Sequence, residues 1–164
     1  MKYSKAIYSV KQTRKIEEYL IQESKIPEFD LMYEAGKAVF DILESKLATC
    51  SKKPPIFVIS GSGNNGGDAY IMAALASKKG YDVCCLEIGC FSGQSEVSKK
   101  AKKLAQENFV NITTYDQNIT FPKKAIIIDG ILGIGIKGEV RAKQAELIKK
   151  INKSKAFIIA IDNP

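Results

Sequence analysis

Three aspartates in this chain occupy positions where a carboxylate can do chemistry. Asp129 and Asp162 each end an apolar run, and Asp68 stands at the expected start of a helix. A carboxyl group at the end of a buried strand can acquire a raised pKa or bind a cation. The simpler interpretations are a capping role for Asp68 and strand-end turns for the other two. Because the chain contains no histidine, acid–base chemistry has to use carboxylates, lysine, tyrosine, cysteine or water.

Glycine-rich segments follow two of the apolar runs. Residues 61–68 read GSGNNGGD after the run at 56–60, and residues 133–138 read GIGIKG after the run at 125–129. Glycine permits positive φ and a close approach of the backbone to a ligand, and a strand, a glycine turn and a helix start together form a cradle for anions. Two such loops predict one shared ligand crevice at the carboxyl edge of a parallel sheet.

Polar side chains inside these loops are further candidate ligands. Asn64 and Asn65 either tolerate left-handed backbone geometry in a tight turn or supply amide oxygens to an alkali or alkaline-earth ion. Lys137 is either a phosphate ligand or a solvent-exposed loop lysine. The residue types alone leave both alternatives open.

A dinucleotide-binding pattern, G-x-G-x-x-G, is formed by Gly61, Gly63 and Gly66. Glu87 lies near the end of the next expected strand, where a ribose-binding acid would stand, so an NAD-dependent dehydrogenase is an alternative function. Three features argue against it: Asp68 beside the expected diphosphate, the second glycine loop, and the absence of histidine as a hydride-transfer acid. No Gly-Lys-Ser/Thr follows either loop, which excludes a P-loop.

Apolar periodicity predicts helices at residues 10–23 and 30–47, the second capped by Asp30, before a β-α-β alternation. The expected strands are residues 56–60, 82–88, 110–115, 125–129 and 156–162, and the expected helices between them are residues 69–79, 94–108 and 141–152. The strands are nearly continuous apolar runs, as in a parallel sheet covered on both faces. We therefore predict an α/β fold: a Rossmann-like three-layer αβα sandwich with a mainly parallel central sheet, preceded by two N-terminal helices.

The composition, 45% hydrophobic and 26% charged over 164 residues, is typical of a single globular domain. No apolar run approaches the about 20 residues that span a membrane, and no signal-peptide core follows the N-terminus. Cys84 and Cys85 are adjacent and no cysteine pair forms CxxC, which favours reduced thiols and a cytoplasmic location. The net charge of +7 includes clustered lysines at 99–103; we interpret them as a solvated helix face and do not expect nucleic-acid binding.

Several motifs occur together in a recognisable order. They are GSGNNGGD at 61–68, DGILGIG at 129–135, GEVR at 138–141 and IDNP at 161–164, with LMYEAG at 31–36 before them. In this order the chain resembles the NAD(P)H-hydrate epimerases, the YjeF N-terminal domain family, over nearly its whole length from residue 10. The NNGGD core is far more specific than a generic dinucleotide pattern.

The resemblance implies a function and a set of residues. The substrate would be hydrated NADH or NADPH (NADHX or NADPHX), which carries a hydroxyl at C6 of the reduced nicotinamide ring. The enzyme would interconvert its R and S epimers for cofactor repair. The implied substrate-binding residues are Asn64, Asn65, Gly66, Gly67, Asp68, Gly133, Ile134, Gly135, Ile136, Lys137, Gly138, Glu139 and Asp162.

The resemblance also implies one potassium ion per subunit, held by Asn65, by Asp129 and by a serine just beyond Pro164. Asp129 is our hypothesis for the catalytic acid–base group. A homodimer is expected, as is fusion to or cooperation with an ADP/ATP-dependent NAD(P)HX dehydratase.

Two expectations concern the limits of this assignment. We expect residues 1–164 to form one such domain, incomplete at its C-terminal end, with any dehydratase domain outside this chain. The other alternative function is a non-catalytic nucleotide- or RNA-associated scaffold of the same fold. The retained Asn64, Asn65, Asp68 and Asp129 argue against a degenerate site.

Overall fold

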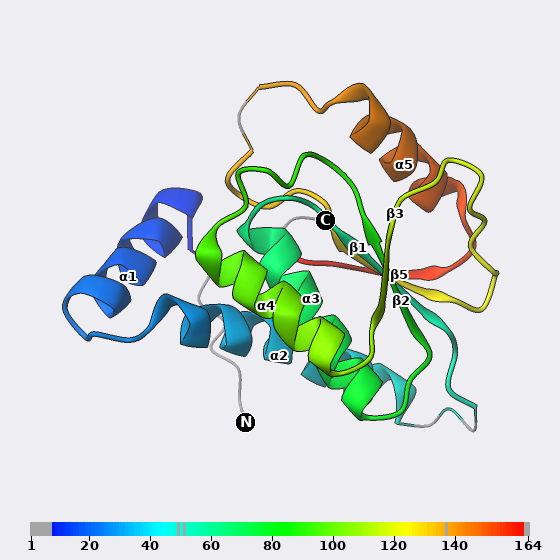
Figure 1. The fold of residues 1–164 in the computed structure, drawn as a ribbon, viewed down its shortest axis with the longest axis horizontal. Helices are drawn as coiled ribbons and strands as arrows, with labels where there is room; N and C mark the ends of the chain where they lie inside the picture. Colours follow the sequence, from blue (N-terminus) through cyan, green and yellow to red (C-terminus); the bar gives the residue numbers. More distant parts are fainter. Residues whose placement is uncertain (1–7, 49, 51, 137, 163–164) are drawn as a thin grey trace.

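A parallel β-sheet forms the centre of the molecule (Figure 1). The computed structural model describes residues 8–48, 50, 52–136 and 138–162. Within these residues the sheet order is β3-β2-β1-β4-β5. The strands are β1 (Ile56–Ser60), β2 (Val83–Glu87), β3 (Asn111–Thr114), β4 (Ile126–Gly130) and β5 (Phe157–Ala160). The predicted α/β class and parallel sheet are confirmed, and the strands agree with their predicted bounds to within two residues.

Helices cover both faces of the sheet (Figure 1). They are α1 (Val10–Gln22), α2 (Glu28–Leu47), α3 (Asn64–Lys78), α4 (Glu96–Glu107) and α5 (Ala142–Lys153). One apolar core joins α2, α3 and α4 to one sheet face, with Tyr70, Ile71 and Met72 fully buried. A second core joins α5 to the other face through Leu147 and Ile151. The predicted three layers are therefore present.

The strand register aligns the carboxyl ends of the central strands. Ser60 of β1 pairs with Glu87 of β2 on one side and with Gly130 of β4 on the other. The connections that follow β1 and β4 therefore leave the sheet side by side, which brings the two glycine-rich segments together as predicted.

Helix α3 begins earlier than its sequence pattern predicts. Its first residue is Asn64, with Gly63 as N-cap in extended geometry, so the segment from Asn64 to Asp68 is helical and not part of a loop. The freedom to adopt positive φ is not used here, because none of the glycines in this segment has a positive φ.

These glycines are instead required for close packing. A Cβ atom on Gly66 would overlap the carbonyl oxygen of Gly61, and one on Gly61 would overlap the carbonyl oxygen of Ile131. A Cβ on Gly67 would lie 2.5 Å from the Met32 side chain. The glycines let the start of α3 press against the turn after β1 and the loop after β4.

The predicted cap of the second helix is wrong as well. Helix α2 begins at Glu28 with Pro27 at the N-cap position, so Asp30 lies in the first helical turn. Its carboxylate still stands at the positive end of the helix dipole, where it is favourable without capping. Among the described residues, no helix is long and apolar enough to cross a membrane.

We predict that Gly66→Ala destabilises the fold although alanine is the better helix former. The helical preference of alanine is worth about 1 kcal/mol, whereas forcing a side chain into a packed backbone contact typically costs about 1–3 kcal/mol. The methyl group would meet main chain that cannot rotate away, so the packing cost wins. Urea unfolding measures the difference.

Gly93→Ala is the matched control, because a Cβ there meets nothing within 4 Å. Its free energy of unfolding should stay within about 0.5 kcal/mol of the starting protein. Equal stability of the two variants would refute the packing role of Gly66.

Candidate functional site

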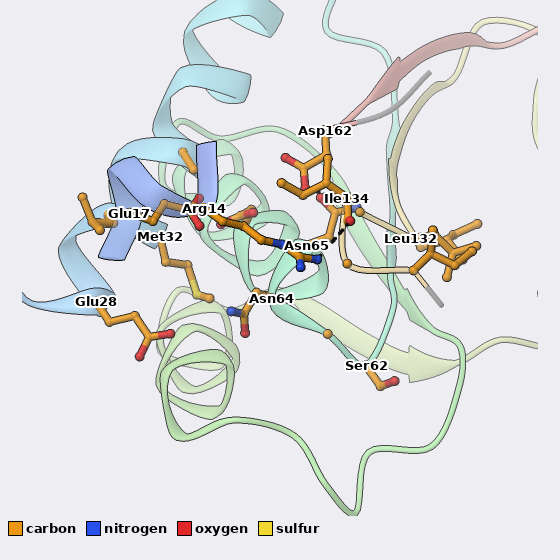
Figure 2. A pocket seen from close by; sticks show the side chains of 18 of the residues that line it. Arg14, Glu17, Glu28, Met32, Ser62, Asn64, Asn65, Leu132, Ile134 and Asp162 are labelled. Atoms are coloured by element: carbon orange, nitrogen blue, oxygen red, sulfur yellow. Dashed lines mark hydrogen bonds between the residues drawn. The ribbon is translucent and has the colours of Figure 1, made fainter. Parts of the chain in front are cut away.

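A cleft of about 510 Å³ opens at the carboxyl edge of the sheet (Figure 2). Its walls come from the start of α3, the loop after β4, the end of β5, and helices α1 and α2. Of the residues predicted from sequence, those that line it are Asn64, Asn65, Asp68, Gly133, Ile134, Gly135, Ile136 and Asp162. The predicted residues outside its lining are Gly66, Gly67, Asp129, Gly138 and Glu139. Lys137 lies outside the described residues.

The N-terminus of α3 faces this cleft. The first amides of a helix have no partner inside it, and Gly63 at the N-cap offers no side chain to accept from them. Asn64 is held in place by Ser95, which lies just before α4. The Ser95 hydroxyl donates a hydrogen bond of 3.1 Å to Asn64 Oδ1. Uncapped amides at the positive end of a helix favour an anion. The helix start that the predicted anion cradle requires is present, and anion binding itself stays a prediction.

Asn65 is the most unusual polar residue of the cleft. Only 6% of it is exposed, yet neither its amide oxygen nor its amide nitrogen has a hydrogen-bond partner among the described residues. A buried amide without partners costs free energy. The second glycine loop passes close by, since a Cβ on Gly133 would lie 3.0 Å from the Asn65 Cβ. Asn65 is therefore available to a ligand or ion.

Asp68 lies one helical turn after Asn65 and lines the same cleft. Burial is the main reason that the pKa of its carboxyl is raised from 3.8 to about 8, and the negative charges of Asp162 and Glu17 contribute to the same shift. A carboxyl with this pKa is mainly protonated at neutral pH. It can donate a proton without a histidine.

Asp162 follows β5 and bends back towards the second loop. Its φ of 66° is left-handed, a conformation that non-glycine residues rarely adopt and that often marks functional sites. The backbone N–H of Ile134 donates to its Oδ2 at 3.4 Å. This contact joins the end of β5 to the loop after β4.

Asp129 is the second-last residue of β4 and does not line the cleft. Burial raises the pKa of its carboxyl, and a hydrogen bond from the Ile131 N–H to Oδ1, at 3.0 Å, acts in the opposite direction. Its acid–base role stays a prediction, and Asp68 becomes the better placed candidate for proton transfer.

Helix α1 contributes residues that the motifs do not indicate. Arg14 and Glu17 both line the cleft, and Arg14 Nη2 donates a hydrogen bond to the Ile134 carbonyl oxygen at 3.4 Å (Figure 2). Burial raises the pKa of Glu17, and the charge of Asp162 does so as well. Their spacing of three residues places them on one helix face, but nothing in the local sequence indicates which way that face points.

Glu87 is not available for a ribose. The hydroxyl of Tyr70 donates to its Oε1, and Lys102 Nζ lies 2.6 Å from the same oxygen. Only 13% of the Glu87 side chain is exposed. In a dehydrogenase Glu87 would bind the ribose of the cofactor. Because it is already paired inside the protein, the dehydrogenase alternative is disfavoured.

The comparisons with known proteins identify the family. Residues 28–164 match the family model described as YjeF-related protein N-terminus. The chain belongs to this family. The match includes the start of α3, both glycine-rich segments and the described end of β5. Helix α1 lies outside the matched residues.

Several relatives of this YjeF-type chain carry names. It is 33% identical over 158 residues to the bifunctional NAD(P)H-hydrate repair enzyme Nnr of Coxiella burnetii. The aligned region includes 96% of this chain but only 31% of the Coxiella burnetii protein. It is 31% identical to the NAD(P)H-hydrate epimerase of Elusimicrobium minutum, with 92% of this chain and 71% of that protein covered.

A solved structure supports the same relationship. The crystal structure of yeast ynu0 matches 97% of this chain and 70% of that chain, with a TM-score of 0.81 and 25% identity. The Rossmann-like fold of this YjeF-type chain is therefore shared with a relative of low sequence identity.

The raised pKa of Asp68 predicts a loss of stability with increasing pH. The folded state binds this proton more tightly than the unfolded state, where the pKa is about 3.9. The stabilising effect is complete below pH 4 and is lost as the pH rises towards 8. Asp68→Asn should reduce this loss by at least about 1 kcal/mol, since one unit of pKa corresponds to about 1.4 kcal/mol. Urea unfolding between pH 4 and 8.5 measures it.

Asp41→Asn removes the same charge from a half-exposed position on α2, where Asp41 pairs with Lys37, and is the control. It should leave the slope of stability against pH unchanged. Identical slopes for Asp68→Asn and the starting protein would contradict the buried, protonated carboxyl.

Proposed function

We propose that this chain is an NAD(P)H-hydrate epimerase that interconverts the R and S forms of NADHX and NADPHX. The proposal is supported by membership of the YjeF family and by the names of the relatives. The strongest structural support is that Asn65, Asp68 and Asp162 line one cleft, beside the N-terminus of α3, which has no side-chain cap. Such a cleft offers proton transfer and anion binding together.

The reaction inverts C6 of the hydrated ring and needs protons to move at the C6 hydroxyl. In one route the hydroxyl is protonated, the C6–O bond breaks, water leaves, and the N1 electron pair forms a C6=N1 double bond. Water then adds to the opposite face and loses a proton. In the other route the hydroxyl proton is transferred to N1 as the C6–N1 bond breaks, and the resulting aldehyde rotates before the ring closes again.

Both routes use a group that gives a proton and takes it back. Asp68 fits this role because its carboxyl is protonated near neutral pH and faces the cleft. Asp162 and Glu17 are further carboxylates at the same cleft, and the charge of either favours the protonated form of Asp68. Asp129 remains our second candidate for proton transfer.

A potassium ion is part of the proposal. Among the described residues, the Asn65 amide oxygen has no hydrogen-bond partner and Asp129 Oδ2 accepts no hydrogen bond. Uncharged and carboxylate oxygens are the ligands that suit a hard cation. The described residues contain no group of three or more His, Cys, Asp or Glu side chains able to hold a metal. A bound potassium ion would supply positive charge next to the two glycine-rich segments.

Homodimerisation, a cytoplasmic location and cooperation with an NAD(P)HX dehydratase are further parts of the proposal. The name of the Coxiella burnetii relative, a bifunctional repair enzyme, supports the link to a second repair activity.

Epimer equilibration tests the function directly. Purified R-NADHX is incubated with the chain in potassium buffer, and both epimers are followed by chromatography against an enzyme-free control. We expect acceleration by the chain and a rate that falls as the pH rises through about 8, where Asp68 loses its proton. Asp68→Asn should lower kcat by about 10²–10⁴-fold.

Asp129→Asn is measured alongside. A large loss in Asp129→Asn with full activity in Asp68→Asn would transfer the acid–base role to Asp129. Absence of acceleration by the unaltered chain would reject the epimerase activity of these residues and favour the scaffold alternative.

Potassium binding has its own test. Replacing potassium by tetramethylammonium at equal ionic strength should lower both the epimerisation rate and the Tm, because a ligand of the native state stabilises it. Asn65→Leu should abolish the difference in Tm between the two salts. A Tm of the unaltered chain that is independent of potassium would refute this site.

A further inference from the structure

Helix α1 forms one wall of the cleft without being part of the apolar core. Arg14, Glu17 and Ile21 line the cleft, whereas none of the side chains of α1 is buried. Figure 2 shows Arg14 extending from α1 across the cleft towards the loop at Ile134. The helix thus places a cation at the site although little apolar contact requires it to be there.

Arg14 has few partners in this position. Its contact with the Ile134 carbonyl oxygen is long, at 3.4 Å, and it forms no ion pair within 4.0 Å among the described residues. A guanidinium carries five N–H donors in a rigid fork that matches two phosphate or carboxylate oxygens. Most of the donor capacity of Arg14 is therefore unused by the protein.

The charges around the cleft make this cation important. Glu17, Glu28, Asp68 and Asp162 all line it, and Arg14 is the one arginine or lysine among its described lining residues. A dinucleotide carries a diphosphate with two negative charges, which the carboxylates of Glu17, Glu28 and Asp162 would repel. The uncapped amides of α3 attract an anion, and a guanidinium is the side chain best suited to complete such a site.

We propose that Arg14 binds the diphosphate of the hydrated dinucleotide, opposite the N-terminus of α3, so that α1 forms part of the substrate site. This inference rests on the proposed epimerase function and extends it to a helix outside the residues matched to the family.

Substitution of Arg14 tests the inference. Arg14→Gln should raise KM for NADHX by about tenfold or more, which is the effect of losing a charged hydrogen bond, and should change kcat by less than about threefold. Arg14→Lys should recover part of the loss, since it keeps the charge but not the fork. Lys15→Gln, which removes the same charge from an exposed position on α1 outside the cleft lining, should leave KM unchanged.

Binding provides a readout that does not depend on activity. Calorimetry with ADP-ribose, which contains the diphosphate, should show about tenfold weaker binding to Arg14→Gln than to the unaltered chain. Binding of adenosine, which has no phosphate, should not change.

The outcomes separate the two proposals. If the unaltered chain epimerises NADHX and Arg14→Gln keeps its KM and its affinity for ADP-ribose, the role of Arg14 is refuted and the epimerase function stands. If the unaltered chain does not epimerise NADHX, the proposed function fails. The role of Arg14 in diphosphate binding is then supported by weaker ADP-ribose binding to Arg14→Gln and refuted by unchanged binding. Equal KM effects of Arg14→Gln and Lys15→Gln would indicate a general charge effect and overturn the specific contact.

Discussion

The close approach of three backbone segments is the constraint on which the site depends. Helix α3, the turn after β1 and the loop after β4 meet at glycines, because side chains there would overlap neighbouring carbonyl oxygens or side chains. A Cβ on Gly130 would lie 2.6 Å from the Ala69 Cβ, and one on Gly133 would lie 2.5 Å from Asp162 Oδ2. The absence of side chains at these contacts brings Asn65 close to the second loop, in the cleft that Asp68 also lines.

The electrostatics of the cleft follow from this packing. The buried amide of Asn65 finds no hydrogen-bond partner in the described part of the chain, and burial keeps the Asp68 carboxyl protonated near neutral pH. Glu17 and Asp162 come from opposite ends of the described chain and add negative charge at the same place. The result combines a proton donor, an unpartnered amide and an uncapped helix start within one cavity. Each of these features is unfavourable for stability alone, and together they are what a binding site requires.

The strands of the sheet, and the meeting of the segments that follow β1 and β4, could be predicted from the sequence. Long apolar runs such as that at residues 125–129 identify buried parallel strands, whose carboxyl ends lie at one edge of the sheet. The strand order was not predicted and comes from the structure. The start of α3 was mispredicted because glycine serves both turns and close helix packing, and its identity alone does not distinguish them. Arg14 and Glu17 could not be found, since the position of α1 is decided by tertiary contacts and no motif marks it.

Asp68 shows how a chain without histidine can work with protons near neutral pH. Its pKa is a property of the surrounding wall more than of the carboxyl itself, because exclusion of water is the largest cause of its shift. A substitution that admits solvent to the cleft would therefore lower the pKa of Asp68 although no polar residue changed. The pH range of such a protein can change through its apolar residues alone.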